Sequence, residues 1–217
     1  DSVASRGLGD VYKRQGGAVY SPALTDFIFM TKNTSYMFVT GPNVVKTVTN
    51  EEVTAEELGG AETHMVKSGV THFACENELE TIKNLKKLIG YIPQNCEETP
   101  KNLAYKFGDE NRLKLDDLIP ENPNQPYDIN EVISEIVDEN SFLEVQNNYG
   151  ENIVVGFARL AGRSIGLVAN QPAVLAGVLD VNASKKGKVL GQKALGWGYM
   201  STCLLYTSDA ADEGLGV

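Results

Sequence analysis

The feature that most restricts the fold is a hairpin pattern between residues 152 and 170. Two strongly apolar runs, NIVVGFARL at 152–160 and SIGLVAN at 164–170, flank a short segment that contains Ala161 and Gly162. Glycine reaches positive φ without steric cost, so Gly162 suits the tight turn between two antiparallel strands. Runs of this length that are rich in valine, isoleucine and phenylalanine are typical of strands. The pattern therefore predicts a β-hairpin.

The remainder of the chain alternates short strands with helices. Residues 76–89 space their apolar side chains three or four apart with lysines and glutamates between them, which predicts an amphipathic helix that covers a core face. Asp128 can cap a further helix that runs to Val137. The other predicted elements are a helix over residues 18–24, strands over 27–30 and 35–39, and a helix that begins at Pro42. This alternation indicates an α/β organisation.

Gly16 and Gly17 form a glycine pair directly before the first predicted helix. Two residues without a Cβ let backbone N–H groups approach a ligand closely, as in an oxyanion hole at a helix N-terminus. A glycine pair by itself is also typical of a plain tight turn. A second pair, Gly59 and Gly60, can supply either loop flexibility or further backbone donors.

The segment GGAVYSPALTDF at residues 16–27 resembles the carboxyltransferase (β) subunit of biotin-dependent acyl-CoA carboxylases, of the propionyl-CoA carboxylase β and methylmalonyl-CoA decarboxylase α types. Further segments extend this resemblance in the family's order. They are TGPNVVK at 40–46, TNEEV at 49–53, ELGGAETH at 57–64, FLEV at 142–145, the hairpin, NQP at 170–172 and GVLD at 177–180. The resemblance spans residue 16 to about residue 186.

The resemblance implies a crotonase-like α/β fold of ββα units, with this chain spanning the junction of two such domains. Residues 16–92 correspond to the C-terminal part of the N-terminal carboxyltransferase domain, and residues 127–186 to the N-terminal part of the C-terminal domain. The intervening residues 93–126, rich in Pro, Asn, Asp and Glu, are expected to form an ordered inter-domain linker. Residues 187–217 do not follow the family.

The resemblance also implies an activity, which is carboxyl transfer between carboxybiotin and a short-chain acyl-CoA through a thioester enolate. Gly16 and Gly17 match the family's first oxyanion hole. The implied substrate-binding residues are Ala18, Val19, Tyr20, Ser21, Gly59 and Gly60, and the implied biotin-side residues are Asn170, Gln171 and Pro172. No metal is expected.

The implied cofactor is biotin, carried by a partner subunit or domain, and the implied partners are biotin carboxylase and biotin carboxyl carrier subunits. A homo-oligomer with active sites shared between subunits is expected. One alternative is a biotin-dependent decarboxylase that runs the reverse transfer beside a membrane pump. Others are a crotonase-type hydratase or isomerase, and a truncated chain with no activity by itself.

Both ends of the chain resemble translated sequencing adaptor. Residues 10–15, DVYKRQ, can be encoded by GATGTGTATAAGAGACAG, and the reverse complement of that DNA, read one base off, encodes CLLYTS at 203–208. The string is similar to a transposon mosaic-end adaptor. We therefore expect residues 1–15 and 203–217 to make few long-range contacts with residues 16–186.

Composition excludes several classes of function. A formal net charge of −10 without clusters of Lys and Arg argues against a nucleic-acid surface. A G-x-S-x-G elbow is absent, so the histidines, His64 and His72, are expected to be hydrogen-bonded structural residues rather than bases of a hydrolase. Three scattered cysteines match no disulfide or zinc spacing, which favours a cytoplasmic location.

Overall fold

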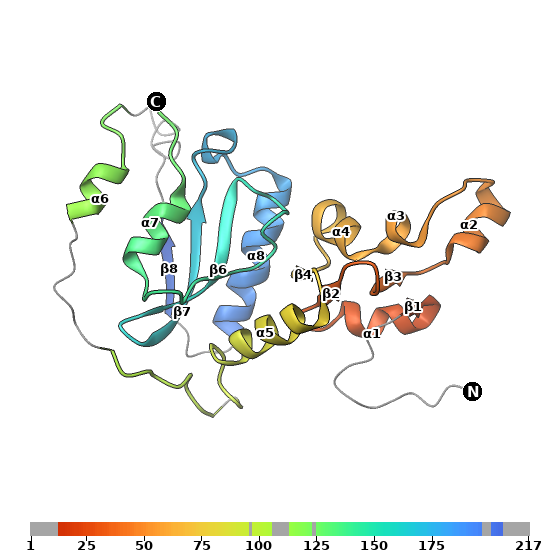
Figure 1. The fold of residues 1–217 in the computed structure, drawn as a ribbon, viewed down its shortest axis with the longest axis horizontal. Helices are drawn as coiled ribbons and strands as arrows, with labels where there is room; N and C mark the ends of the chain where they lie inside the picture. Colours follow the sequence, from red (N-terminus) through yellow and green to blue (C-terminus); the bar gives the residue numbers. More distant parts are fainter. Residues whose placement is uncertain (1–12, 96, 106–112, 123–124, 197–200, 206–217) are drawn as a thin grey trace, which may run out of the picture. The chain divides into compact units, whose positions relative to one another are not determined.

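The computed structural model describes residues 13–95, 97–105, 113–122, 125–196 and 201–205 (Figure 1). It divides into two compact units between Leu85 and Lys86. We call residues up to Leu85 unit 1 and residues from Lys86 unit 2. The division falls within a helix, α5, a few residues before the predicted linker at 93–126. The domain scheme drawn from the resemblance stays a prediction.

Unit 1 contains two short parallel strand pairs and several short helices. Strand β1 pairs with β3, and β2 pairs with β4. Its elements are β1 (Lys13–Gln15), the 3-10 turn η1 (Gly16–Val19), α1 (Tyr20–Ala23), β2 (Phe29–Thr31), β3 (Tyr36–Phe38), α2 (Pro42–Thr49), α3 (Ala55–Gly59), α4 (Ala61–Thr63), the π-helical turn η2 (His64–Ser68), β4 (Phe73–Cys75) and the first part of α5 (Glu78–Ile89). The predicted strands and helices are therefore present, with small shifts at their ends.

The core of unit 1 joins its first turn to its strands. Its buried cluster consists of Val19, Ile28, Met30, Met37 and Ala61. The strands contribute Met30 and Met37, while η1 contributes Val19 and the start of α4 contributes Ala61. Burying these side chains anchors both glycine-containing segments on one core.

The two histidines make the structural hydrogen bonds expected of them. Nε2 of His64 lies 2.6 Å from the carbonyl oxygen of Met37, so this nitrogen carries the proton, because a carbonyl can only accept. Its Nδ1 lies 2.8 Å from Oγ of Ser68. His72 is buried, and its Nδ1 accepts from the backbone N–H of Ile28 at 3.1 Å.

Helix α5 forms where its apolar spacing predicts, but the expectation that its apolar side covers a core face is wrong. Leu88 is the one buried residue of this helix, whereas Leu79 is 80% exposed and Ile89 is 56% exposed. The side that meets β2 and β4 is polar, since Thr81 contacts Thr31. Spacing identifies an apolar stripe, but it does not say which side of the helix the protein covers.

Unit 2 is built on a four-stranded sheet in the order β5-β6-β7-β8. β6 runs antiparallel to both β5 and β7, and β8 runs parallel to β7. Besides the end of α5, its elements are α6 (Leu113–Leu118), α7 (Ile129–Ile136), β5 (Leu143–Glu144), β6 (Ile153–Leu160), β7 (Arg163–Asn170), the 3-10 turn η3 (Leu175–Gly177), α8 (Val181–Gly196) and β8 (Ser201–Leu205). The predicted hairpin is confirmed as β6 and β7.

The hairpin turn uses two residues with positive φ rather than one. Ala161 has φ 51° and Gly162 has φ 77°, so the chain reverses through a left-handed pair of residues. The Asp138 carboxylate accepts hydrogen bonds from the N–H groups of Ala161 and Gly162 at 2.8 and 2.7 Å. This carboxylate holds an alanine in a conformation that side chains disfavour.

Helix α7 covers the hairpin with its apolar side. Ile129, Val132 and Ile133 are buried against residues of β6 and β7. Asp128 caps the helix as predicted, because its carboxylate accepts from the N–H of Asn130 at 2.9 Å. From the expected linker, Leu115 and Leu118 of α6 pack against the same core.

Arg159 of β6 ties the segment after α5 to the hairpin. Its guanidinium donates to the carbonyl oxygens of Lys101, Gly162 and Gly90 at 3.0, 2.9 and 2.6 Å. It also lies over the Tyr91 ring, 5.3 Å from the centroid. The N–H of Leu103 adds a bond to the Gly162 carbonyl. Arg159 thus provides hydrogen-bond donors to three backbone carbonyl oxygens that would otherwise need water.

Both segments that resemble adaptor are paired within the described residues. β1 aligns Lys13–Gln15 with Tyr36–Phe38, and β8 aligns Ser201–Leu205 with residues 165–169 of β7. The expectation of few long-range contacts is therefore wrong for these two segments. Ladder hydrogen bonds join backbone groups, so an open strand edge accepts an extended segment with little regard to its side chains. Residues 1–12 and 206–217 lie outside the described residues.

Candidate functional site

The first glycine pair lies at the start of a short helical segment. Gly16 and Gly17 open the 3-10 turn η1, which continues without interruption into α1. The first N–H groups of a helix have no partner within it and carry a partial positive charge. A Cβ built on Gly17 would meet no atom within 4 Å, and Gly17 itself is exposed. The geometry therefore leaves room for an acyl oxygen beside this backbone.

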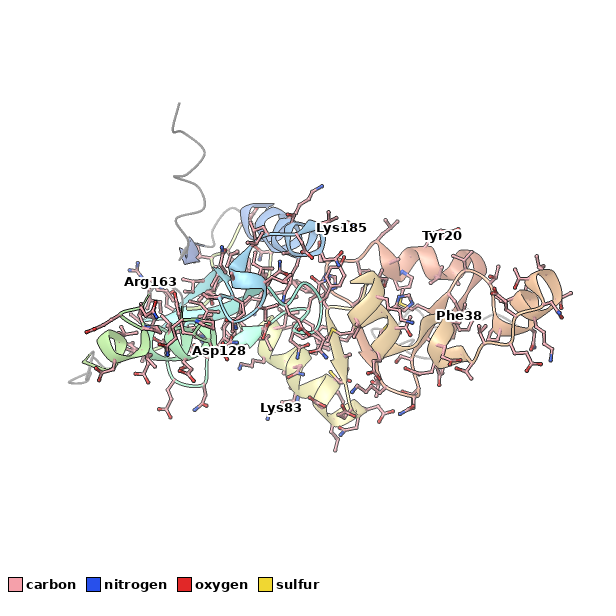
Figure 2. The ribbon with its side chains drawn as sticks, turned by 90° about the horizontal axis from the view of Figure 1, so that it is seen from above. Tyr20, Phe38, Lys83, Asp128, Arg163 and Lys185 are labelled. Carbon is pink, nitrogen blue, oxygen red and sulfur yellow. The ribbon has the colours of Figure 1, made fainter. Side chains whose placement is uncertain are left out.

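The next four residues divide into an exposed group and a buried one. Ala18, Tyr20 and Ser21 are exposed, with Tyr20 on the outer surface of α1 (Figure 2). Val19 is buried in the core of unit 1. Because its side chain packs into this core, only the backbone of Val19 is left for substrate binding. The binding roles of all four residues stay predictions.

The second glycine pair is explained by close packing. A Cβ on Gly59 would collide with the backbone carbonyl group of Met37 and would lie 3.0 Å from the Phe38 ring. Gly60 pairs with Tyr36 in an isolated antiparallel bridge, and a Cβ there would meet the Glu56 carboxylate. Glycine is therefore required at position 59 for the approach of α3 to β3. A role of Gly59 and Gly60 in substrate binding stays a prediction.

An open hollow of about 310 Å³ lies over α3, α4 and η2. Its lining residues are Glu56, Glu57, Glu62, Thr63, Val66 and Lys67. Hydrogen bonds from the backbone and side chain of Thr54 lower the pKa of Glu57. Three carboxyl groups around one lysine make this hollow unsuited to the phosphates of a coenzyme. The sequence shows these residues only as a charged stretch without a motif, so the hollow was not expected.

The three predicted biotin-side residues lie at the end of β7 in unit 2. Asn170 donates through Nδ2 to the Gly177 carbonyl at 3.1 Å. Gln171 donates through Nε2 to the Asp128 carboxylate at 2.7 Å and accepts from the N–H of Ile129 at 3.2 Å. Asn170 and Gln171 are buried, and Pro172 is partly exposed. Their side chains brace η3 and the start of α7, and their role toward biotin stays a prediction.

The hydrogen bonds at the start of α7 also set the charge of Asp128. Burial raises the pKa of this carboxyl, but hydrogen bonds from Gln171 and from Asn130 outweigh burial and lower the pKa overall. Asp128 is therefore ionised at neutral pH, which suits its position at a helix N-terminus.

Unit 2 also contains a charged pair, a buried lysine and a partly exposed glutamate, that sequence patterns did not single out. Nζ of Lys186 in α8 lies 3.5 Å from Oε1 of Glu144 in β5, and the Lys186 side chain has no exposed surface. Burial raises the pKa of Glu144, and the nearby lysine partly opposes this. Burial lowers the pKa of Lys186, and Glu144 partly opposes that. The only signal available in the sequence is the group Lys185, Lys186 and Lys188, and such a lysine group is typical of an exposed surface.

No metal site and no membrane span emerge in the part of the chain that the structure describes. Within it, no group of three or more His, Cys, Asp or Glu side chains is placed to hold a metal ion. Among the same residues, every helix is too short or too polar to cross a membrane.

Comparison with known proteins places the chain in a family. The carboxyl transferase domain matches residues 12–192. The propionyl-CoA carboxylase beta chain of Roseobacter denitrificans is 55% identical over 173 residues, which cover 79% of this chain and 34% of that protein. The methylmalonyl-CoA decarboxylase subunit alpha of Veillonella parvula is 53% identical over 175 residues, which cover 79% of this chain and 34% of that protein.

A solved structure confirms the predicted fold. Transcarboxylase 12S, with methylmalonyl-coenzyme A and methylmalonic acid bound, is 41% identical with a TM-score of 0.82, over 93% of this chain and 40% of that one. This chain therefore belongs to the carboxyl transferase domain family and has its crotonase-like α/β fold. It spans about a third of the length of the curated relatives that it matches.

Proposed function

We propose that this chain is part of a carboxyltransferase subunit that moves a carboxyl group between carboxybiotin and a short-chain acyl-CoA of the propionyl-CoA/methylmalonyl-CoA class. The observation that carries the proposal is the family match over residues 12–192, within which the Gly16-Gly17 pair lies at an open helix start. The names of the relatives support the substrate class, since both act on propionyl-CoA or methylmalonyl-CoA.

The chemistry needs stabilisation of a negative oxygen more than it needs a side-chain base. Bound biotin would supply the transferable carboxyl group and, after its release, the nitrogen that accepts the α-proton of the thioester. Gly16 and Gly17 would direct backbone N–H groups at the enolate oxygen. A preorganised donor of this kind contributes about 3 kcal/mol to transition-state stabilisation. The open space beside Gly17 fits this role, because a thioester could approach without displacing protein atoms.

Partners follow from the same chemistry. We propose that biotin is carried by a biotin carboxyl carrier and loaded by a biotin carboxylase. We further propose that the subunit forms a homo-oligomer with shared active sites, and the hexamer assembly of the similar transcarboxylase 12S supports this. A cytoplasmic location agrees with Cys75, a buried free thiol.

The reverse reaction is a second candidate, because the Veillonella decarboxylase subunit is nearly as similar as the carboxylase chain. In that case the partner would include a membrane pump. Both directions use the same enolate and the same backbone donors. The 217 residues by themselves are expected to be inactive, because they span a third of the relatives' length.

The test places Gly17→Val in a full-length carboxyltransferase subunit that contains this chain. The branched side chain keeps the thioester oxygen away from the backbone donors, and losing the contact with even one such donor costs roughly a hundredfold to a thousandfold in rate. Formation of malonyl- or methylmalonyl-CoA from carboxybiotin should therefore fall at least that far, with thermal melting unchanged. Lys185→Ala, an exposed change on α8 (Figure 2), is the control. Normal transfer by folded Gly17→Val would assign the glycine pair to a structural turn.

A further inference from the structure

The loop after β7 contains a turn in which successive residues have positive φ. Leu175, Ala176 and Gly177, which form η3, have φ angles of 49°, 52° and 73°. This left-handed conformation is sterically costly for residues that carry a Cβ, so Leu175 and Ala176 keep it only because neighbouring groups fix the backbone. Strain of this kind is frequent at functional sites. The side chains that hold η3 are therefore candidates for a role in the reaction.

Two buried asparagines hold the end of this turn. Asn170, the last residue of β7, donates through Nδ2 to the Gly177 carbonyl at 3.1 Å. Asn152, which directly precedes β6, donates through Nδ2 to the Val178 carbonyl at 2.5 Å. The two asparagines are 6% and 2% exposed, so water has little access to these amides. The open end of the hairpin thus fixes the backbone where it leaves η3.

Gln171 fixes the other end of the turn and joins it to helix α7. Its backbone carbonyl accepts from the N–H of Val174 at 3.0 Å, and the Val174 carbonyl accepts from the N–H of Gly177 at 2.9 Å. Its side chain accepts from the N–H of Ile129 at 3.2 Å and donates to the carboxylate of Asp128, labelled in Figure 2, at 2.7 Å. The start of α7 and the segment that enters η3 therefore depend on one side chain.

The two amides predicted to face biotin are already engaged within unit 2. Asn170 and Gln171 are each 6% exposed, and the nitrogens of their side chains donate to protein oxygens. Direct contact with biotin through the Gln171 amide would break its bonds to Asp128 and Ile129, and a buried group left without its partner is costly. All of these contacts lie within unit 2, so they do not depend on the placement of unit 1. The two amides therefore fit a role that acts through the backbone they hold.

We propose that Asn170 and Gln171 are positioning residues for the carboxyl transfer proposed above, with Asp128 acting through Gln171. Their side chains hold the backbone of residues 172–177 in its strained conformation, and neither amide contacts biotin. A segment that is fixed in advance needs no ordering when a ligand binds, and a misplacement of about 1 Å costs roughly a hundredfold in rate. The inference rests on the proposed function, and it assigns positioning rather than binding to Asn170 and Gln171.

The kinetic test measures kcat and KM for carboxybiotin in the full-length subunit used for Gly17→Val. Gln171→Ala should lower kcat/KM by about tenfold to a hundredfold, and Asp128→Ala should do the same. The double variant should match Gln171→Ala, because Asp128 acts through that side chain. Asp128→Asn keeps the accepting Oδ1 and should stay within about threefold of wild type. Glu131→Ala, which removes an exposed acid from the first turn of α7, is the matched control and should leave kcat/KM unchanged.

Hydrogen exchange provides a readout that needs no biotin. In the 217-residue chain, the Val174 and Gly177 amides should exchange faster in Gln171→Ala than in wild type, because η3 loses the side chain that fixes its entry. Asn170→Asp keeps the shape of the side chain but loses the donor to the Gly177 carbonyl, so it should accelerate the same amides and also lower kcat/KM. Wild-type exchange rates in both variants would show that these amides do not hold η3.

Gln171→Glu adds a pH dependence that a general loss of stability would not produce. It places a second carboxylate against Asp128, at the position from which the amide donates. Facing carboxylates raise the pKa of one of them, so the contact returns once that group binds a proton. Transfer relative to wild type should therefore rise as pH falls from about 8 to about 6. Glu144, which is paired with Lys186, also interacts with Asp128, and the comparison with wild type removes its effect.

The kinetic results also separate this inference from the proposed function. Wild-type kcat/KM in Asp128→Ala, beside a loss in Gln171→Ala, would mean that Gln171 contacts the substrate itself. Lower melting temperatures with unchanged kcat and KM in both variants would leave the amides a structural role only. Either result with an active wild-type subunit overturns this inference alone, whereas a wild-type subunit without any transfer overturns the proposed function and this inference together.

Discussion

Lys186 lies wholly inside unit 2 with its ammonium 3.5 Å from the carboxylate of Glu144. The pKa of Glu144 is raised from 4.5 by burial and the pKa of Lys186 is lowered from 10.5 by burial. Both directions show that removal from water exceeds the mutual attraction of the pair. The pair therefore links α8 to β5 without adding much to the free energy of unfolding. Removing only one of its two charges should nevertheless destabilise unit 2, because the other charge loses its partner.

Lys186→Met should destabilise unit 2 by up to about 3 kcal/mol near pH 8, because the partly buried Glu144 is left without its cation. Its pKa then rises further above the value in the unfolded chain. A carboxyl with a raised folded pKa gives most stability below its unfolded pKa, and that stability is lost as pH rises through the folded pKa. The deficit should thus be smaller near pH 5 in urea unfolding. Equal deficits at both pH values, or no recovery in Lys186→Met/Glu144→Gln, would contradict this account.

Gly59 and Gly17 should respond oppositely to alanine. In Gly59→Ala the new Cβ meets the Met37 backbone, which cannot move without shifting β3, so a loss of about 2 kcal/mol or more is expected. In Gly17→Ala the new Cβ meets open space, and stability should change by less than about 0.5 kcal/mol. Thermal melting of both variants measures the difference. Comparable melting temperatures would show that α3 does not approach β3 as closely as described.

Arg159→Met should loosen the segment after α5 more than it disturbs the sheet. The substitution removes donors from the carbonyls of Lys101, Gly162 and Gly90, at an expected cost of about 3 kcal/mol. Hydrogen exchange at the Leu103 amide should accelerate. Arg163→Met, an exposed change at the start of β7, is the control and should leave that exchange rate unchanged. Unaltered protection of Leu103 in Arg159→Met would show that the segment is held by other contacts.

Ala161→Asn should stabilise the hairpin by about 1 kcal/mol. Alanine at φ 51° has most of the steric energy cost of the left-handed conformation. This cost is smaller for asparagine. The turn keeps its hydrogen bonds to Asp138, because these use backbone N–H groups. Chemical unfolding of the two proteins measures the gain. A neutral or destabilising result would mean that other effects of the asparagine side chain cancel the relief of backbone strain.

Local patterns predicted much of the fold. The hairpin was predicted over 152–160 and 164–170, and it lies at Ile153–Leu160 and Arg163–Asn170. Pro42 begins α2 as expected. The orientation of α5 was not predictable, because the spacing of its apolar residues is the same whichever side is covered. The pairing of β1 and β8 was missed because ladder bonds depend on the backbone, which sequence patterns do not describe.

The sequence names two glycine pairs as candidate site residues, and their roles toward a ligand stay predictions. Gly16 and Gly17 begin η1, and a Cβ on Gly17 would meet no atom within 4 Å. Gly59 carries the same sequence signal, yet packing against Met37 explains it. Gln171 likewise bonds within the protein. A single sequence does not distinguish a glycine beside open space, such as Gly17, from one that admits a neighbouring strand, such as Gly59, because both occur in it as the same glycine pair.

The short turn at Ala161 and Gly162 has a consequence for how the chain acquires its structure. β6 and β7 are neighbours in sequence, and closing such a hairpin takes about 1–10 μs. Strands β2 and β4 align Phe29 with Phe73, which are far apart in the sequence. Pairing them closes a longer loop and therefore costs more chain entropy than closing the hairpin. We therefore expect the hairpin of unit 2 to form before the parallel strands of unit 1 pair, with the Asp138 carboxylate holding the turn at Ala161 and Gly162.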